Sequence, residues 1–328
     1  MRGKKFMRIA GYIAFAVVAL LFFLYATFPA PAVAQRLAHE VQRMTGGKVV
    51  MTFSDASLYR FSGIAAEGVK LRFTSDDGGE AGSKPMEIEL DRVSVRVRLL
   101  PLLVFNLSAS IGAELGAGSL DAVVSMGDDG VEFEVEIVDL DFASPPLLAR
   151  LTGVPVNGKL VGKAKGKLSM GALRRRPGQP AGGSGFAPEM SEGQASLTLR
   201  EAGFGPGAVA GFTIPAAIGF GQIDLALDMR RGRLRLASFQ QKGGNVGLKA
   251  SGTVTLRRNL KASNLDTCLQ FKFTDKEYLI KYPKVNTMLQ FAQVQLRKDG
   301  EGFLHWKFGG TIGNPRRQSG LCRKVGRK

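Results

Sequence analysis

The chain has 328 residues, with 45 Lys and Arg against 28 Asp and Glu, so its formal net charge is +17. Its hydrophobic content of 45% is too high for a disordered chain and is sufficient for a packed core. Only two His and two Cys are present, which excludes zinc fingers, His-rich metal sites and disulfide-dense scaffolds. The 42 Gly and the small number of aromatic residues favour many short strands over a helical bundle.

The N-terminal residues predict a membrane anchor. Residues 9–28 are 20 residues without a charge, and a helix of that length spans the roughly 30 Å hydrocarbon core of a bilayer. Four cations precede this segment, against three in the 20 residues after it, so the positive-inside rule places the stub 1–8 in the cytoplasm. The alternative is a signal peptide cleaved after Ala34, although the apolar stretch is longer than is usual for one.

A short juxtamembrane helix is expected over residues 29–47. Val33, Leu37, Val41 and Met44 follow one another at helical spacing, and Gly46-Gly47 ends the pattern.

From Lys48 onward the hydrophobic period is two, which predicts β-strands over 48–170 and 193–315. Residues 120–126 and 131–137 flank Gly127-Asp128-Asp129-Gly130, a hairpin pattern, and the polar pair Asp91-Arg92 suggests a β-bulge. Segments 223–229, 234–236 and 246–256 predict an antiparallel meander. The fold class is therefore mainly β: a transmembrane helix followed by an elongated antiparallel sheet or sandwich with a few short helices.

Three segments interrupt the strands. Short helices are expected over 145–151 and after a capping box at residues 274–277, the second being broken at Pro283. Residues 171–192 are rich in Gly and Pro and lack either period, which predicts a flexible insertion. Residues 316–328 form a basic tail.

Two glycine-rich motifs resemble nucleotide loops only superficially. The segment 153–159 matches the first seven positions of a phosphate-binding loop, but Leu160 stands where Ser or Thr must bind Mg²⁺, and a strand follows instead of a helix. Gly203, Gly205, Gly207 and Gly211 have neither the spacing nor the βαβ context of a dinucleotide loop.

No constellation of residues predicts catalysis or metal binding. His39 lies close to the anchor, and His305 is expected to point outward beside Trp306. Glu132, Glu134 and Glu136 are two apart along one strand, as in a solvated charged ladder. We therefore expect no catalytic residue, no cofactor, no metal and no enzymatic activity.

Two features leave alternatives open. A lysine face over residues 159–167 is either a solvated outer surface or a contact for an acidic partner or lipid head groups, whereas nucleic acid is disfavoured because aromatic residues are absent from the basic clusters. Cys268 and Cys322 could form a disulfide if their Cα atoms lie within about 7 Å, although Cys322 falls in the basic tail.

Taken together, the anchor, the proline-led helix, the Gly-rich strands and the segment Phe308 to Arg316 (FGGTIGNPR) resemble the type II secretion system protein N family. Segments 151–162 and 243–256 support the resemblance. The family resembles, more distantly, AsmA-like envelope proteins, whose β structures present an apolar groove to lipids. The resemblance supplies no catalytic residues.

The resemblance implies a single-pass inner-membrane protein with a periplasmic β domain, an accessory or scaffold component of the type II secretion pathway. Its partners would be the inner membrane and other secretion-system components. The alternative is an AsmA-like protein that binds or transfers lipid.

Overall fold

The computed structural model describes residues 11–12, 15–16, 19–20, 22–23, 25, 27–60, 62–73, 86–102, 106–127, 130–141, 155–169, 187–209, 212–287, 290, 297–318 and 320–322. The chain forms two compact units, residues 1–99 and 100–328. Each is mainly antiparallel β-sheet with few and short helices, which confirms that the fold is mainly β. The predicted helix over 145–151 lies outside the described residues.

The first unit pairs four strands beside one helix. The helix is α2 (Ala30–Met44), and the strands are β1 (Val49–Thr52), β2 (Asp55–Tyr59), β3 (Gly63–Phe73) and β4 (Met86–Val97). Strand β3 pairs with all three of the others. The pairing of β3 with β4 has the same register on both sides of Asp91, since Glu67 lies opposite Arg92 and Val69 opposite Leu90. The predicted bulge at Asp91-Arg92 is therefore wrong, and the irregular residue is Gly68 of β3, at φ +57°.

Helix α2 confirms the predicted helix, and its burial shows which side faces the strands. Ala30, Ala34 and Ala38 are buried, and the helix contacts β1, β2 and β3. The buried residues of those strands include Ala56 and Ala65. Leu37, Val41 and Met44 lie on the adjoining side of α2 and are exposed.

The predicted anchor is only partly described. Between residues 9 and 28, the described residues up to Tyr25 are helical. Large apolar side chains among them are exposed, with Tyr12 at 75% and Phe15 at 72%. Within the described residues, no helix has the length and apolar character needed to cross a bilayer.

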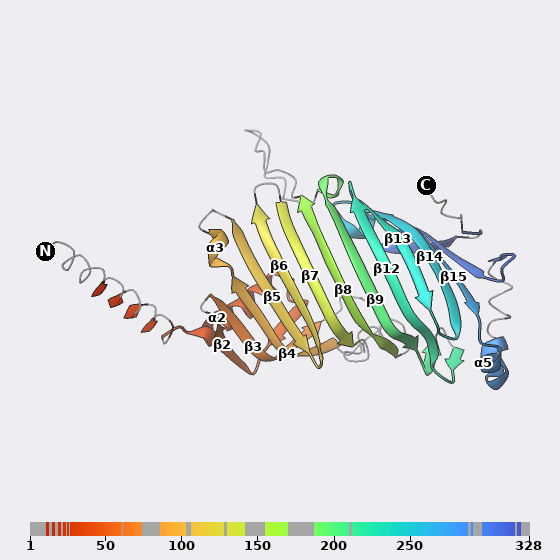
Figure 1. Cartoon of the computed structure of the whole chain (residues 1–328), viewed down its shortest axis with the longest axis horizontal. Coiled ribbons are helices and arrows are strands. Elements are labelled where there is room, and N and C mark those ends of the chain that lie inside the picture. The colour runs from red at the N-terminus through yellow and green to blue at the C-terminus, as the bar shows by residue number, and fades with distance from the viewer. Residues whose placement is uncertain are drawn as a thin grey trace. The chain divides into compact units, whose positions relative to one another are not determined.

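The second unit is built on one antiparallel sheet, whose strands β5 to β9 and β12 to β15 lie side by side in a single layer (Figure 1). Its strand order is β5-β6-β7-β8-β9-β12-β13-β14-β15-β17-β16, and β18 also pairs with β17. The strands are β5 (Leu107–Leu115), β6 (Gly118–Gly127), β7 (Gly130–Asp141), β8 (Val156–Ser169), β9 (Glu192–Phe204), β12 (Ile218–Arg230), β13 (Arg233–Lys242), β14 (Val246–Thr255), β15 (Asn264–Phe273), β16 (Arg297–Lys298), β17 (Leu304–Thr311) and β18 (Asn314–Gln318). A separate pair is formed by β10 (Gly207–Val209) and β11 (Phe212–Ile214).

Local turn chemistry explains why the sequence predicted much of this sheet. Gly127 pairs with Gly130 where β6 turns into β7, as the hairpin pattern indicated. The meander β12-β13-β14 is also confirmed, and its first turn places Arg231 and Gly232 at positive φ. Such turns favour glycine because it has no Cβ to clash.

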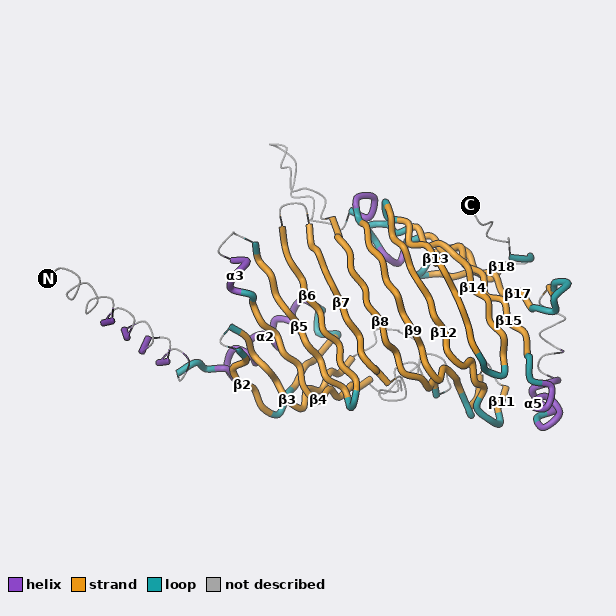
Figure 2. Tube along the Cα trace, in the orientation of Figure 1, coloured by secondary structure: helices purple, strands orange, loops and turns teal. Residues whose placement is uncertain are grey.

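The helices of the second unit are short and lie at the ends of strands (Figure 2). They include α3 (Leu99–Leu102), which spans the boundary between the units, the 3-10 helices η1 (Pro188–Met190) and η2 (Leu260–Ala262), and α5 (Lys276–Lys281). The side chain of Asp275, rather than that of Thr274, caps α5 by accepting a hydrogen bond from the Tyr278 N–H at 2.9 Å. The helix ends before Pro283, as predicted, and residues 283–287 are helical again.

Parts of the predicted flexible insertion and of the predicted basic tail belong to ordered structure. Residues 170–186 lie outside the described chain, but Ala187 and Ser191 are buried, and the Ser191 hydroxyl donates to the Ala187 carbonyl at 2.9 Å. Strand β9 then begins at Glu192. In the tail, Arg316 and Arg317 belong to β18, whose pairing with β17 extends the sheet. The Ser191 hydrogen bond and the pairing of β18 with β17 thus give defined structure to residues that hydrophobic periodicity did not assign to a helix or strand.

Candidate functional site

Strand alternation gives the sheet of the second unit one apolar face. Directly opposite residues on neighbouring strands share a face, so the register defines rows of side chains across the sheet. The central row of the apolar face runs from β5 to β13: Ile111, Ala122, Val135, Ala164, Ala195, Leu227 and Leu236. The row on one side of it contains Phe133, Gly166, Gly193 and Met229. The row on the other side contains Ile137, Gly162, Leu197 and Leu225.

The middle of this apolar face is half-buried, and none of the residues that the structure describes forms a covering layer over it. Val135, Ala164, Ala195 and Leu227 all have intermediate exposure. Among the described residues, η1 is the only helix that packs closely on β7, β8 or β9, and it does so at the Ser169 end of β8. A sheet face that is apolar and uncovered is a candidate binding surface.

Small residues give the middle of the face a low floor between larger side chains. Ala164 lies opposite Ala195, and Gly166 lies opposite Gly193. The large neighbours lean over the glycines, because a Cβ on Gly166 would lie 3.0 Å from the Phe133 ring and one on Gly193 3.6 Å from the Met229 methyl. The row from Ile111 to Leu236, here called the alanine row, is therefore low at Ala164 and Ala195 and rises to Val135 and Leu227 on either side. Such a row can hold an extended apolar chain by contact alone.

The opposite face of the sheet is polar and electrically paired. The predicted glutamate ladder and lysine face are neighbours, since Glu132, Glu134 and Glu136 of β7 lie opposite Lys167, Lys165 and Lys163 of β8. Lys163 Nζ is 2.8 Å from Glu136, and Lys167 Nζ is 3.7 Å from Glu132. The hydrogen bond and charge of Glu136 raise the pKa of Lys163 above its ordinary value. Lys163 and Lys167 are therefore paired with carboxylates within the sheet, which supports the solvated-surface interpretation.

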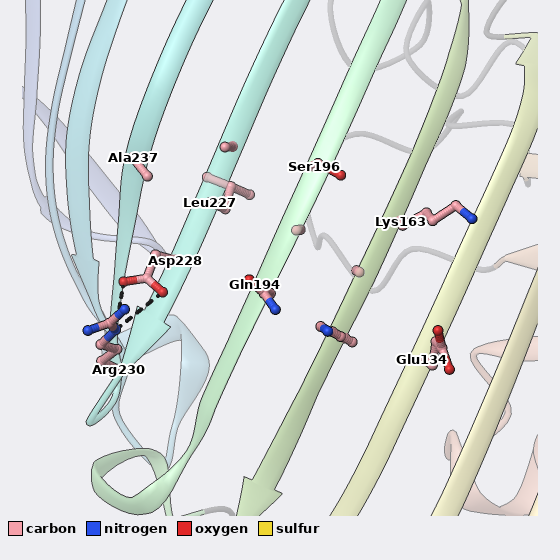
Figure 3. A pocket seen from close by; sticks show the side chains of 12 residues that line it. Glu134, Lys163, Gln194, Ser196, Leu227, Asp228, Arg230 and Ala237 are labelled. Atoms are coloured by element: carbon pink, nitrogen blue, oxygen red, sulfur yellow. Dashed lines mark hydrogen bonds and ion pairs between the residues drawn. The ribbon is translucent and has the colours of Figure 1, made fainter.

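A shallow pocket of about 550 Å³ lies on this polar face, across β7 to β13 (Figure 3). Ser196, Ala226 and Ala237 contribute short side chains to its lining, and Glu134, Lys163, Lys165, Asp228 and Arg230 contribute charged ones. Arg230 is committed to Asp228, with Nε 3.0 Å from the carboxylate. No His or Cys lines the pocket, so it offers neither a thiol nucleophile nor an imidazole base.

At the β15–β17 end, the polar face is closed by a disulfide between Cys268 and Cys322, whose Cα atoms are 5.9 Å apart. The open question of the cysteines is thereby answered. Cys322 reaches β15 because β18 carries the tail back along β17.

His305 is buried beneath this disulfide, so the expectation that its side chain points outward is wrong. It is 6% exposed, whereas its neighbour Trp306 is 40% exposed. Alternation does place His305 on the polar face opposite Gln270, but the segment around Cys322 covers it there. His39 is exposed on α2, as expected of a residue without a structural role.

Both ring nitrogens of His305 are already in use. The Cys322 N–H donates to Nδ1 at 2.9 Å, and Nε2 is 3.0 Å from the Asp299 carboxylate. Burial acts to raise the pKa of Asp299, but hydrogen bonds from His305 and from the Phe303 and Glu301 N–H groups outweigh it, so the pKa is lowered. Cys268, His305 and Cys322 have the composition of a metal site and their donor atoms lie within 4.8 Å. Because the two sulfurs form a disulfide and both ring nitrogens of His305 already have partners, this cluster in its present form is a structural cross-link.

The two nucleotide-loop motifs fall in or beside ordinary strands. Gly158 and Lys159 are part of β8, residues 151–154 lie outside the described chain, and Gly203 is part of β9. No helix follows Lys159, so the described part of this motif lacks the strand-to-helix geometry that a phosphate loop needs.

Sequence reasoning missed two features of the sheet. The pairing of the Glu and Lys ladders could have been found from their common period and equal length. The Gly and Ala floor could have been found from small residues recurring at the apolar positions of 162–166 and 193–195.

Comparisons with protein families, curated proteins and solved structures find no match for this chain. The resemblance to the type II secretion system protein N family accordingly stays a prediction.

Proposed function

We propose that this protein acts by binding: an N-terminal helix anchors it to a membrane, and the apolar face of the second unit holds acyl chains of lipids. The observation that carries the proposal is the uncovered alanine row. The row from Ile111 to Leu236 crosses six inter-strand gaps, about 29 Å at roughly 4.8 Å each. The hydrocarbon of one bilayer leaflet is about 15 Å thick, so the row is longer than an acyl chain that spans one leaflet.

The energetics of the face favour an apolar ligand over a polar one. Each methylene that leaves water contributes about 0.8 kcal/mol, so a chain lying along the row binds by accumulated contact without specific polar groups. The opposite face carries its charges in pairs, which fits a surface that stays in water.

The proposed anchor rests on residues 9–28. Their lack of charge and their length suit a bilayer, and Phe22 and Phe23 are 65% and 64% exposed. Aromatic side chains exposed along a helix are expensive in water and stable in lipid.

The lipid proposal is tested by photo-crosslinking in cells grown with labelled phosphate, using the full chain. A photoreactive amino acid replaces Ala195 on the apolar face, and the same amino acid replaces the adjacent Gln194 on the polar face as the matched control. We expect labelled lipid to be attached at position 195 and not at position 194.

The result of that experiment decides whether the apolar face binds acyl chains. Equal labelling at both positions, or none at position 195 in a protein that folds and pairs its cysteines normally, contradicts acyl-chain binding. Repeating the substitution at Ala164, which lies opposite Ala195, guards against a single unfavourable geometry.

A role in type II secretion is a second proposal, and it is supported by the sequence resemblance alone. Under it, deleting the gene lowers export of folded substrates while envelope permeability stays normal. Under the lipid proposal alone, export is unchanged and the crosslink to lipid persists.

A further inference from the structure

Helix α2 has an apolar stripe that neither its sequence position nor its packing in the first unit explains. Leu37, Val41 and Met44 lie on adjacent turns of the same side of the helix, and they are 44%, 37% and 80% exposed. The helix already meets the strands through Ala30, Ala34 and Ala38. Burying the alanines while exposing the larger side chains is the reverse of what packing in water favours.

The chain connection restricts what can cover this stripe. Phe28 ends the proposed anchor and α2 begins at Ala30, so a single residue, Pro29, separates them. The Ala30 N–H donates to the Phe28 carbonyl at 2.9 Å, which keeps this junction compact. One residue spans about 3.5 Å, so the start of α2 lies at the membrane surface if residues 9–28 cross the bilayer.

The charges of α2 suit the same location. Arg36 and Arg43 lie on a neighbouring side of the helix, and the Arg43 side chain is 74% exposed while it pairs with Glu40 at 2.7 Å. A helix with an apolar stripe and flanking cations is the type that lies in a membrane interface.

We infer that α2 lies along the membrane surface, with Leu37, Val41 and Met44 inserted at the boundary between head groups and acyl chains. This inference rests on the anchor of the proposed function. The helix is about 22 Å long, and its stripe reaches the last residue, so insertion of the whole stripe fixes the helix parallel to the surface. The first unit is then held against the bilayer by two linked elements instead of by one flexible tether.

The test measures the depth of single residues in the full chain, reconstituted in phosphatidylcholine vesicles containing phosphatidylglycerol. A fluorescent label is attached to Leu37→Cys, Val41→Cys or Met44→Cys, and Gln35→Cys on another side of α2 is the matched control. Labelled wild-type protein, whose two cysteines are bonded to each other, sets the background. Lipids brominated near the head-group end of the acyl chain quench labels that lie about 5–10 Å below the surface.

We expect quenching at positions 37, 41 and 44 to exceed quenching at position 35 by roughly threefold or more, in line with insertion of one face only. A label at Leu20→Cys, quenched by lipids brominated at the chain end, reports the anchor separately. Quenching at position 20 with none at 37, 41 and 44 overturns the inference and leaves the anchor intact. Absence of quenching at position 20 overturns the anchor itself. Labels at 37 and 41 that are shielded from water but insensitive to brominated lipid indicate a protein partner, which also overturns the inference.

Discussion

One end of the second unit's apolar face and the middle of that face show what a covering segment changes. Near β14 and β15, α5 and the turn after it pack on the sheet, and Ile218, Val246, Tyr278 and Val285 form a buried cluster. Across β7 to β9, the same alternation of apolar and polar residues leaves Val135, Ala164 and Ala195 half-exposed. The strands are alike in pattern, and the difference is the presence of a few residues outside the sheet.

The comparison separates stability from binding. At the covered end, Tyr278 fills the cluster with its ring and donates its hydroxyl to the Ala216 carbonyl at 3.0 Å. The same end carries the disulfide and the His305 contacts on the polar face. The uncovered middle has small side chains and no such links among the described residues, so it is the part of the sheet that can accept a ligand without unfolding.

Truncation at the covered end should have the largest effect on stability. Tyr278→Ala removes a ring 4.8 Å from that of Tyr282 and leaves a cavity, so we expect a loss of about 3–5 kcal/mol in the free energy of unfolding. Urea denaturation of the purified protein measures it. Tyr278→Phe is the control, since it removes only the hydroxyl hydrogen bond and should cost about 1 kcal/mol. A similar loss at the half-exposed Val135→Ala would contradict the distinction between the two regions.

The disulfide should have the next largest effect. Cys322→Ser frees a tail that the bridge ties across 54 residues, and the loss of that link should cost roughly 2–4 kcal/mol. Limited trypsin digestion provides a second measurement, because Arg316 and Arg317 should become early cleavage sites when β18 detaches. Unchanged stability together with an intact β18 would show that strand pairing alone holds the tail.

The sequence predicted those parts of the molecule in which the signal is local. The β6–β7 hairpin follows from four turn residues, and α5 follows from a cap and a proline. The burial of His305 does not follow from its neighbours, because the covering residue is Cys322, 17 positions along the chain. Periodicity assigns a side chain to a face, but whether that face is covered depends on contacts distant in sequence.

The candidate site shows the same limit. One apolar face was predictable from alternation, and so were the Glu and Lys ladders, but the pairing of β7 with β8 that neutralises them is a matter of register. On α2, hydrophobicity alone ranks Leu37 above Ala34 as a core residue. Close approach of the helix to the strands selects the smaller side chain instead.

At the covered end, the contribution of Asp275 to the free energy of unfolding should depend on pH in the acid range. The backbone N–H of Tyr278 and then the side chain of Asn245 lower the pKa of Asp275 below its ordinary value of 3.8. A carboxyl with a lowered pKa stabilises the fold fully above pH 3.8, and this contribution disappears as the pH falls through the folded-state pKa. In Asp275→Asn, which keeps a capping oxygen, we expect the stability difference from wild type to shrink between pH 6 and pH 2, about the range over which the carboxylate protonates. A constant difference across that range in urea titrations would contradict the role of the charge.

The smallest effect is expected on the polar face of the uncovered middle. The Glu136 and Lys163 side chains are 48% and 70% exposed, and water and salt screen their attraction. We therefore expect Glu136→Gln to leave the unfolding free energy unchanged within experimental error. The pair has a different consequence for binding, because an unneutralised Lys163 would add a cation to the pocket on the polar face. Crosslinking from position 194 in the Glu136→Gln background tests this point. New lipid adducts there would mean that charge pairing, and not only the polarity of the face, keeps lipid on the apolar side of the sheet.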